Sequence, residues 1–275
     1  MKAEKNGVKF VYPNGSRKAL TLRFDDAPIA DKKMLELLNR HSLKATFYIS
    51  MGMLKDDKHV SPLEIEKLYR SHEVANHTYS HLDPRKHTLS YDKLCEELLR
   101  GKLELEKMTD QKVSGYAYVC SSYGAVGRDE YCRALEQTGH KYAIMGRENN
   151  CFEPDIENRF DIGQSFRFAS ENLVDKAREF CALKPENDLC LILAMAHTYE
   201  FDMDRFPYGW DRAESFCNVV AERDDIWYTT NGELVGYLLA LKNFLNSDST
   251  QNTTYRSLFY ESTNGIKELK AGECV

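Results

Sequence analysis

Residues 19–41 read ALTLRFDDAPIADKKMLELLNRH and contain one complete strand-and-helix unit. The mainly apolar residues 19–24 predict a strand, and residues 31–41 place four apolar side chains on one side of a predicted helix. Two adjacent aspartates, Asp25 and Asp26, directly follow the strand. Units of this kind build sheets whose faces are covered by helices.

The alternation of short apolar runs and helical patterns continues along the chain. Further strands are predicted at residues 45–49, 73–75, 115–119, 141–145, 189–196 and 226–229. Further helices are predicted at residues 61–69, 91–108, 129–138, 171–183, 211–222 and 232–244. Repeated βα units indicate an α/β fold with a parallel sheet that is closed, or nearly closed, into a barrel.

The end of the chain differs from this pattern. Residues 246–254 are polar and have little reason to fold by themselves, whereas the last residues carry apolar runs on both sides of an Asn264-Gly265 step. An Asn-Gly step favours the tight turn of a β-hairpin. We therefore expect a barrel over residues 1–246, followed by a linker and a C-terminal β-hairpin over residues 247–275.

Length and charge exclude several classes of protein. A chain of 275 residues with 42% hydrophobic residues can bury a sizeable core. A formal net charge of −6 argues against a nucleic-acid partner and suits a neutral or amino-sugar substrate. The longest apolar run, residues 189–196, is too short to span a bilayer, so no membrane partner is expected. Residues 1–7 lack the apolar core of a signal peptide, which favours a cytoplasmic location, although a removed leader would leave the same sequence.

The eight cysteines include no C-x-x-C pair, so neither a zinc ribbon nor a thioredoxin-like site is indicated. Scattered cysteines in a reducing compartment behave as small apolar residues. Cys120 is accordingly expected to be a packed residue rather than a metal ligand.

Four polar clusters follow predicted strands: Asp25-Asp26, the segment 77–81, the turn 120–124 and His197. In α/β barrels the carboxyl ends of the strands open onto one face, and active sites assemble there. We therefore expect these clusters to converge in space.

His77 and His81 form an H-x-x-x-H pair. If the segment is helical, both imidazoles lie on one side of a turn and can share a metal, whereas two surface histidines would be the simpler alternative. Asp25 and Asp26 point opposite ways if the chain is extended, so one carboxylate can bind a metal while the other acts as a base. The alternative is a helix cap and a solvated neighbour.

His197 and Arg23 each have two interpretations. His197 follows the most apolar predicted strand and is either a satisfied core residue or, from its position at a strand end, a functional one. Arg23 shares a strand facing with Asp25 and either steadies that carboxylate or is solvated at the end of the barrel.

Four segments together resemble motifs of the polysaccharide deacetylases, a family of metal-dependent carbohydrate esterases. Residues 22–27 read LRFDDA, similar to the family's T-F-D-D-G, and residues 44–49 read KATFYI, similar to its K-A-T-F-F. Residues 73–81 read EVANHTYSH, a close match to G-N-H-T-x-x-H, and residues 196–201 read AHTYEF, similar to G-H-S-Y-E-F. The resemblance extends from about Tyr12 to Tyr237.

The resemblance implies a distorted (β/α) barrel of fewer than eight parallel strands with one divalent metal ion, most often zinc, with cobalt or nickel as alternatives. It implies Asp26, His77 and His81 as the metal ligands. It also implies Asp25 as the base that activates water and His197 as the acid that protonates the leaving group. The backbone N–H of Tyr123 would help to hold the oxyanion.

Three positions depart from the family pattern. In the third motif Val119 replaces a proline, and extra residues precede Tyr123. Ala27 stands where glycine is usual and narrows a crowded turn. The fourth motif is not recognisable, so Asp161 is a candidate for the group that orients His197. Arg23 is a candidate for the group that orients Asp25.

Aromatic residues could stack on the rings of a sugar. Trp210 lies in a turn-rich segment after His197 and is the preferred candidate, whereas Trp227 lies in a predicted strand and is expected to pack in the core. The other candidates are Tyr199, Phe206 and Tyr208.

The predicted function is hydrolysis of acetyl groups on an N-acetylated, or O-acetylated, sugar or polysaccharide, with an acetylated oligosaccharide as partner. The altered third and fourth motifs leave open a carbohydrate-binding member that has lost catalysis. Hydrolysis of a non-sugar amide is a further alternative. No feature of the sequence fixes the oligomeric state.

Overall fold

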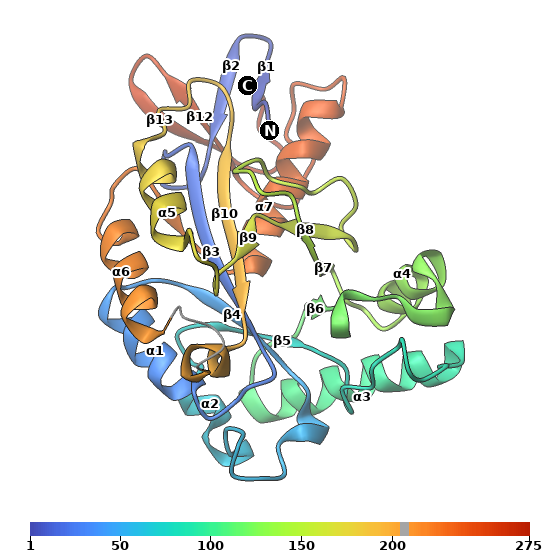
Figure 1. The fold of residues 1–275 in the computed structure, drawn as a ribbon. Helices are drawn as coiled ribbons and strands as arrows, with labels where there is room; N and C mark the ends of the chain where they lie inside the picture. The colour runs from blue at the N-terminus through green and yellow to red at the C-terminus, as the bar shows by residue number, and fades with distance from the viewer. Residues whose placement is uncertain (204–208) are drawn as a thin grey trace.

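The computed structural model describes residues 1–203 and 209–275 (Figure 1). Its main sheet contains nine strands, and every pair in it is parallel. They are β3 (Lys18–Asp25), β4 (Ala45–Ile49), β5 (Glu73–Asn76), β6 (Gly115–Ala117), β7 (Tyr142–Glu148), β8 (Ile162–Gln164), β9 (Phe166–Arg167), β10 (Cys190–Ala196) and β11 (Trp227–Tyr228). The order is β8-β7-β6-β5-β4-β3-β10-β9, and β11 pairs with the first half of β3.

The sheet closes through β8 and β9, which only Ser165 separates. β8 pairs with β7 and β9 pairs with β10, so this one interrupted segment joins the two edges. At the interruption the Ser165 N–H donates to Leu193 O (2.8 Å), and the Leu193 N–H donates to Ser165 Oγ (3.1 Å). The ring therefore has seven strand positions, with β11 as a short addition beside β3, and the predicted distorted barrel of fewer than eight strands is confirmed.

Seven α-helices of the described chain accompany these strands. They are α1 (Asp31–Arg40), α2 (Ile65–Leu68), α3 (Tyr91–Thr109), α4 (Arg128–Gln137), α5 (Leu173–Ala182), α6 (Trp210–Val220) and α7 (Asn231–Asn246). Short 3₁₀ turns occupy Met51–Met53, Pro62–Glu64, Val119–Ser121, Gly124–Val126 and Thr198–Asp202. The helix predicted at 61–69 is instead a 3₁₀ turn followed by the four residues of α2, with Ser61 accepting a bond from the Leu63 N–H (3.4 Å).

Strand alternation divides β3 between two environments. Leu20, Leu22 and Phe24 are fully buried in the layer between sheet and helices, where α1 supplies its apolar face. Burying one such side chain stabilises the fold by about 1.5–3 kcal/mol. The alternate residues, among them Arg23 and Asp25, point into the barrel, which is why polar side chains occupy its interior.

The two ends of the chain form a second, antiparallel sheet, drawn at the top of Figure 1. Its order is β1 (Glu4–Lys5), β2 (Val8–Val11), β12 (Leu258–Ser262) and β13 (Gly265–Leu269). The predicted C-terminal hairpin is confirmed, and Gly265 adopts the positive φ of 100° that its turn requires. The pairing of β12 with the N-terminal β2 was not expected, and the division at residue 246 stays a prediction.

Among the residues that the structure describes, no helix is both long and apolar enough to cross a membrane.

Candidate metal centre and active site

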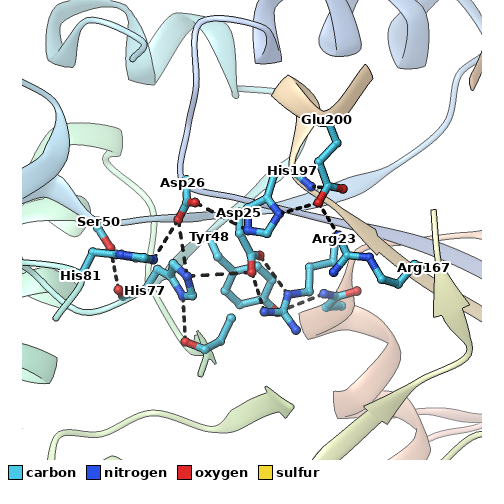
Figure 2. A network of polar contacts seen from close by, with 12 residues as sticks. Arg23, Asp25, Asp26, Tyr48, Ser50, His77, His81, Arg167, His197 and Glu200 are labelled. Atoms are coloured by element: carbon cyan, nitrogen blue, oxygen red, sulfur yellow. Dashed lines mark hydrogen bonds and ion pairs between the residues drawn. The ribbon is translucent and has the colours of Figure 1, made fainter. Parts of the chain in front are cut away.

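Asp26, His77 and His81 lie together at the carboxyl ends of β3 and β5 (Figure 2). One ligand atom from each residue lies within 4.8 Å of the others. Nε2 of His81 is 3.1 Å from Asp26 Oδ1, and Nε2 of His77 is 3.6 Å from the same oxygen. The structure thus brings together the three residues that the family resemblance implied as ligands.

The histidine pair is not helical, so the helical premise for its spacing is wrong. Thr78 and His81 have φ angles of 65° and 52°, and this left-handed backbone bends the segment after β5. The bend brings the two imidazole centroids to 4.9 Å. Gly101 of α3 packs directly behind it, since a Cβ there would lie 2.9 Å from the carbonyl carbon of Thr78.

The two aspartates do not point opposite ways, because the chain leaves the extended conformation at Asp26. Asp26 and Ala27 have φ angles of 78° and 50°. Both carboxylates consequently approach His77, whose Nε2 lies 3.8 Å from Asp25 Oδ2 as well as 3.6 Å from Asp26 Oδ1. Ala27 holds the left-handed conformation that glycine adopts without strain, in line with the glycine usual in the family.

The chemistry of this cluster fits a divalent cation. His77 donates from Nδ1 to the carbonyl of Ala117 (2.8 Å), which leaves the Nε2 lone pair facing Asp26. Burial lowers the pKa of His77 to about 4, so the imidazole is neutral, as a ligand must be. Asp26 Oδ1 is buried, and no described group gives it a hydrogen bond of acceptable geometry. Burial alone would raise the pKa of Asp26, but His81 and His77 beside it hold that pKa below its usual range.

Asp25 is held by Arg23 inside the barrel. The guanidinium donates from Nε to Oδ1 (2.9 Å) and from Nη2 to Oδ2 (2.5 Å), and both side chains are buried. Burial raises the pKa of Asp25, but the opposing charge of Arg23 outweighs it and keeps the pKa below the usual range. The solvated alternative for Arg23 therefore does not describe its position.

His197 follows β10 and faces the same cluster. Its Nε2 lies 3.5 Å from Asp26 Oδ2, and its Nδ1 lies 3.3 Å from Glu200 Oε1. Arg167, at the end of β9, forms an ion pair with the same Glu200 oxygen. Figure 2 shows this chain of contacts running from Arg167 to Asp26.

Glu200 takes the place that the sequence interpretation gave to Asp161. Asp161 pairs with Arg128 (3.0 Å) and Arg147 (3.5 Å), and none of its described ion pairs involves His197. Glu200 lies only three residues after His197 in a 3₁₀ turn, within the motif already matched to the family. The acidic residue three positions after His197 was the signal in the sequence that could have identified Glu200.

The buried carboxyl of Asp31 supports the 3₁₀ turn that follows His197. Asp31, the first residue of α1, accepts hydrogen bonds from Thr198 Oγ1 (2.6 Å) and from the Tyr69 hydroxyl (2.7 Å). Thr198 directly follows His197, so Asp31 anchors the segment that carries the histidine. Burial raises the pKa of Asp31 to about 7.

The third motif forms a strained turn. Cys120 and Ser121 have consecutive φ angles of 52° and 50°, which non-glycine residues seldom adopt. Cys120 is exposed, so the expectation that it is packed is wrong. The Tyr123 ring packs against Tyr118 at 5.0 Å, and burial raises the pKa of its hydroxyl to about 12. The role of the Tyr123 N–H stays a prediction.

Comparison with known proteins supports the resemblance to one family. Residues 12–143, slightly less than half of the chain, match the family model described as polysaccharide deacetylase. No curated protein matches the sequence.

Solved structures agree with the deacetylase domain in fold. A protein from Mycobacterium smegmatis assigned to the polysaccharide deacetylases is 16% identical, with 85% of this chain and 94% of that chain covered and a TM-score of 0.61. A family 4 acetyl xylan esterase from Clostridium thermocellum, in complex with a cobalt ion, is 14% identical, with 81% and 91% covered and a TM-score of 0.50. The CE4 family pseudoenzyme BA3943 from Bacillus anthracis is 18% identical, with 79% and 65% covered and a TM-score of 0.50. This chain thus spans slightly less than two thirds of the pseudoenzyme.

The aromatic candidates lie in different parts of the deacetylase fold. Tyr199 stacks on His197 with centroids 5.1 Å apart, so it lies beside the metal centre. Trp210 begins α6, donates to Asp202 (2.7 Å) and lies under the ammonium of Lys33 (4.4 Å). Trp227 packs on Tyr12 and Tyr237, as expected for a core residue. Phe206 and Tyr208 lie outside the described residues.

Proposed function

We propose that this protein is a metal-dependent deacetylase that removes acetyl groups from an N-acetylated sugar or polysaccharide, with O-acetyl esters as the second linkage. The observation that carries the proposal is the Asp26, His77 and His81 cluster, with Asp25 and His197 both within 4 Å of its members. The cytoplasmic location expected from the sequence stays a prediction.

Two imidazoles and one carboxylate form a ligand set that suits zinc, and also cobalt or nickel. When bound, the cation supplies a Lewis acid for the acetyl carbonyl and lowers the pKa of water. Three protein ligands leave positions open for substrate and water.

Asp25 is placed to accept the proton of the attacking water. The ion pair with Arg23 keeps its carboxylate charged and fixes its orientation. As the bond from water oxygen to the acetyl carbon forms, one proton passes to Asp25. The backbone N–H of Tyr123 is the proposed donor to the oxyanion.

His197 is placed to protonate the leaving amine or alcohol as the bond to the acetyl carbon breaks, which releases acetate. Burial lowers the pKa of His197, but Glu200 at Nδ1 outweighs it and holds the pKa above the usual range. Glu200 thus favours the protonated imidazole that an acid needs. Arg167 orients Glu200.

A second candidate is a family member that binds sugars without turnover. The strained Cys120-Ser121 turn favours it, because this turn lies just before Tyr123, whose N–H is the proposed donor to the oxyanion. Hydrolysis of a non-sugar amide is the third candidate and requires only a different substrate on the same residues.

Acetate release tests these candidates. Protein stripped of metal and then given zinc, cobalt or nickel is assayed on N-acetylglucosamine oligomers and on acetylated xylan. We expect release that depends on the added metal and that Asp25→Asn abolishes while the metal content stays the same. No release from either substrate, with metal bound and the oligomer binding, would establish the non-catalytic alternative.

A further inference from the structure

A large groove lies at the end of the barrel opposite the proposed metal centre. It encloses about 1040 Å³. Ser114 and Lys141, which line it, directly precede β6 and β7, whereas Asp25 and His197 stand at the carboxyl ends of their strands. Residues 253–256, which lead into the C-terminal hairpin, line it together with α7. The groove is therefore separate from the proposed catalytic residues.

The groove is positively charged in an acidic protein. Four cations and one acid line it: Lys141, Arg159, Lys242, Arg256 and Glu157. This is a local charge of about +3 (four minus one) in a chain whose net charge is −6. Such a concentration of one sign attracts ligands of the opposite sign.

The cations are poorly neutralised by the protein itself. The guanidinium of Arg256 lies against Gly236 of α7, and its Nε is buried without a hydrogen-bond partner in the described chain. Neither Arg256 nor the exposed Lys141 has an ion pair among the described residues. Among the residues that the structure describes, the Lys242 ammonium donates to two carbonyl groups, those of Ile156 (3.3 Å) and Glu157 (3.1 Å). Arg159 forms an ion pair with Glu136.

The remaining lining suits sugar rings. The lining includes the amides of Asn158 and Asn243 and the hydroxyls of Ser114, Thr253 and Thr254, and such groups hydrogen-bond sugar hydroxyls. Tyr255 is 78% exposed on its wall, with the Arg256 guanidinium 5.7 Å from its ring centroid, and offers exposed aromatic surface beside that cation. A nucleic acid, with its dense backbone charge, fits less well, because the net charge of the whole chain repels it.

We propose that this groove binds an acidic oligosaccharide, one that carries carboxylates on its sugar rings, with Arg256 and Lys141 as carboxylate partners and Tyr255 as the stacking surface. The site goes beyond the proposed function, since it needs neither the metal nor the catalytic residues. It would hold a glycan on the face of the barrel that points away from the reaction.

Calorimetric titration with a galacturonic acid hexamer tests the proposal. We expect saturable binding that weakens with added salt and persists after metal removal. Lys141→Glu and Tyr255→Ala should each weaken binding by roughly tenfold, which corresponds to about 1.4 kcal/mol. Lys107→Glu makes the same charge change on the exposed side of α3 and should leave binding unchanged within about twofold.

Four results would overturn the proposal. They are no binding by the wild type, equal binding of a neutral N-acetylglucosamine hexamer, loss of binding when the metal is removed, and tighter binding of single-stranded DNA. Arg256→Lys keeps the positive charge but removes the planar guanidinium. Weaker binding of the acidic hexamer by this variant, with an unchanged melting temperature, supports a contact between Arg256 and a carboxylate.

Discussion

Replacing Glu200 by glutamine tests how the proposed acid is supported. The change keeps the size of the side chain but removes the negative charge 3.3 Å from Nδ1 of His197. Two unit charges at that distance interact by about 5 kcal/mol at an effective dielectric constant of 20. Arg167 contacts the same oxygen and competes for that charge, so only part of the interaction reaches the histidine.

We expect Glu200→Gln to lower kcat/KM by about 10–100-fold, the effect typical of an orienting partner, which corresponds to about 1.4–2.7 kcal/mol. An acid must be protonated to act, so activity falls as pH rises through its pKa. Because Glu200 holds the pKa of His197 above its usual range, its loss should move this alkaline fall to lower pH.

Asp161→Asn is the matched control, since the described ion pairs of Asp161 are with Arg128 and Arg147 and not with His197. The assay is acetate release with zinc-loaded protein between about pH 5 and about pH 9, which brackets the ordinary histidine pKa of about 6.5 and a raised one. An unchanged rate and an unchanged alkaline fall in Glu200→Gln would refute the role of Glu200. Loss of activity in Asp161→Asn alone would instead assign the orientation of His197 to Asp161.

Three further changes have defined outcomes. Because burial raises the pKa of Asp31 to about 7, the folded state holds its proton more tightly than the unfolded state, and the contribution of Asp31 to stability should fall as pH rises from about 4 to 7. Asp31→Asn should remove this contribution, so the stability of the variant relative to the wild type should rise by up to about 4 kcal/mol over that range, measured by urea unfolding at several pH values, and a difference that does not change with pH would contradict this. His81→Ala should weaken zinc binding by more than about 100-fold in a chelator competition, because loss of an indirect partner alone costs 10–100-fold. Gly101→Ala should also weaken zinc binding, since its methyl group would press on the loop that carries both histidines. Leu99→Ala, on the exposed side of α3, should leave zinc binding unchanged.

The long elements and the motif residues could be predicted from the sequence. β3 and β10 have seven or eight residues with strong apolar patterns, and the helices carry apolar faces, so periodicity located them within a few residues. Asp26, His77 and His81 were located by their motifs, which directly follow predicted strands.

The missed features depend on short segments and on backbone angles. β8 and β9 have three and two residues, too few to show a period, and β1 and β2 have two and four. The left-handed conformations of Asp26, Thr78 and His81 occur at residues other than glycine, so they could not be predicted from the residue type. The convergence of the two aspartates and two histidines was therefore predicted correctly from incorrect local geometry.

The interrupted strand at Ser165 has a consequence for motion. Short ladders on either side of this serine join the first and last parts of the barrel, so the seam is one place where the wall can open at low cost. Arg167 lies on the β9 side of the seam and holds Glu200, which in turn holds His197. Opening of the seam would free the proposed acid while leaving the proposed metal ligands, which directly follow β3 and β5, in place. The barrel wall would then be mobile beside the proposed acid, His197, and rigid beside the proposed metal ligands.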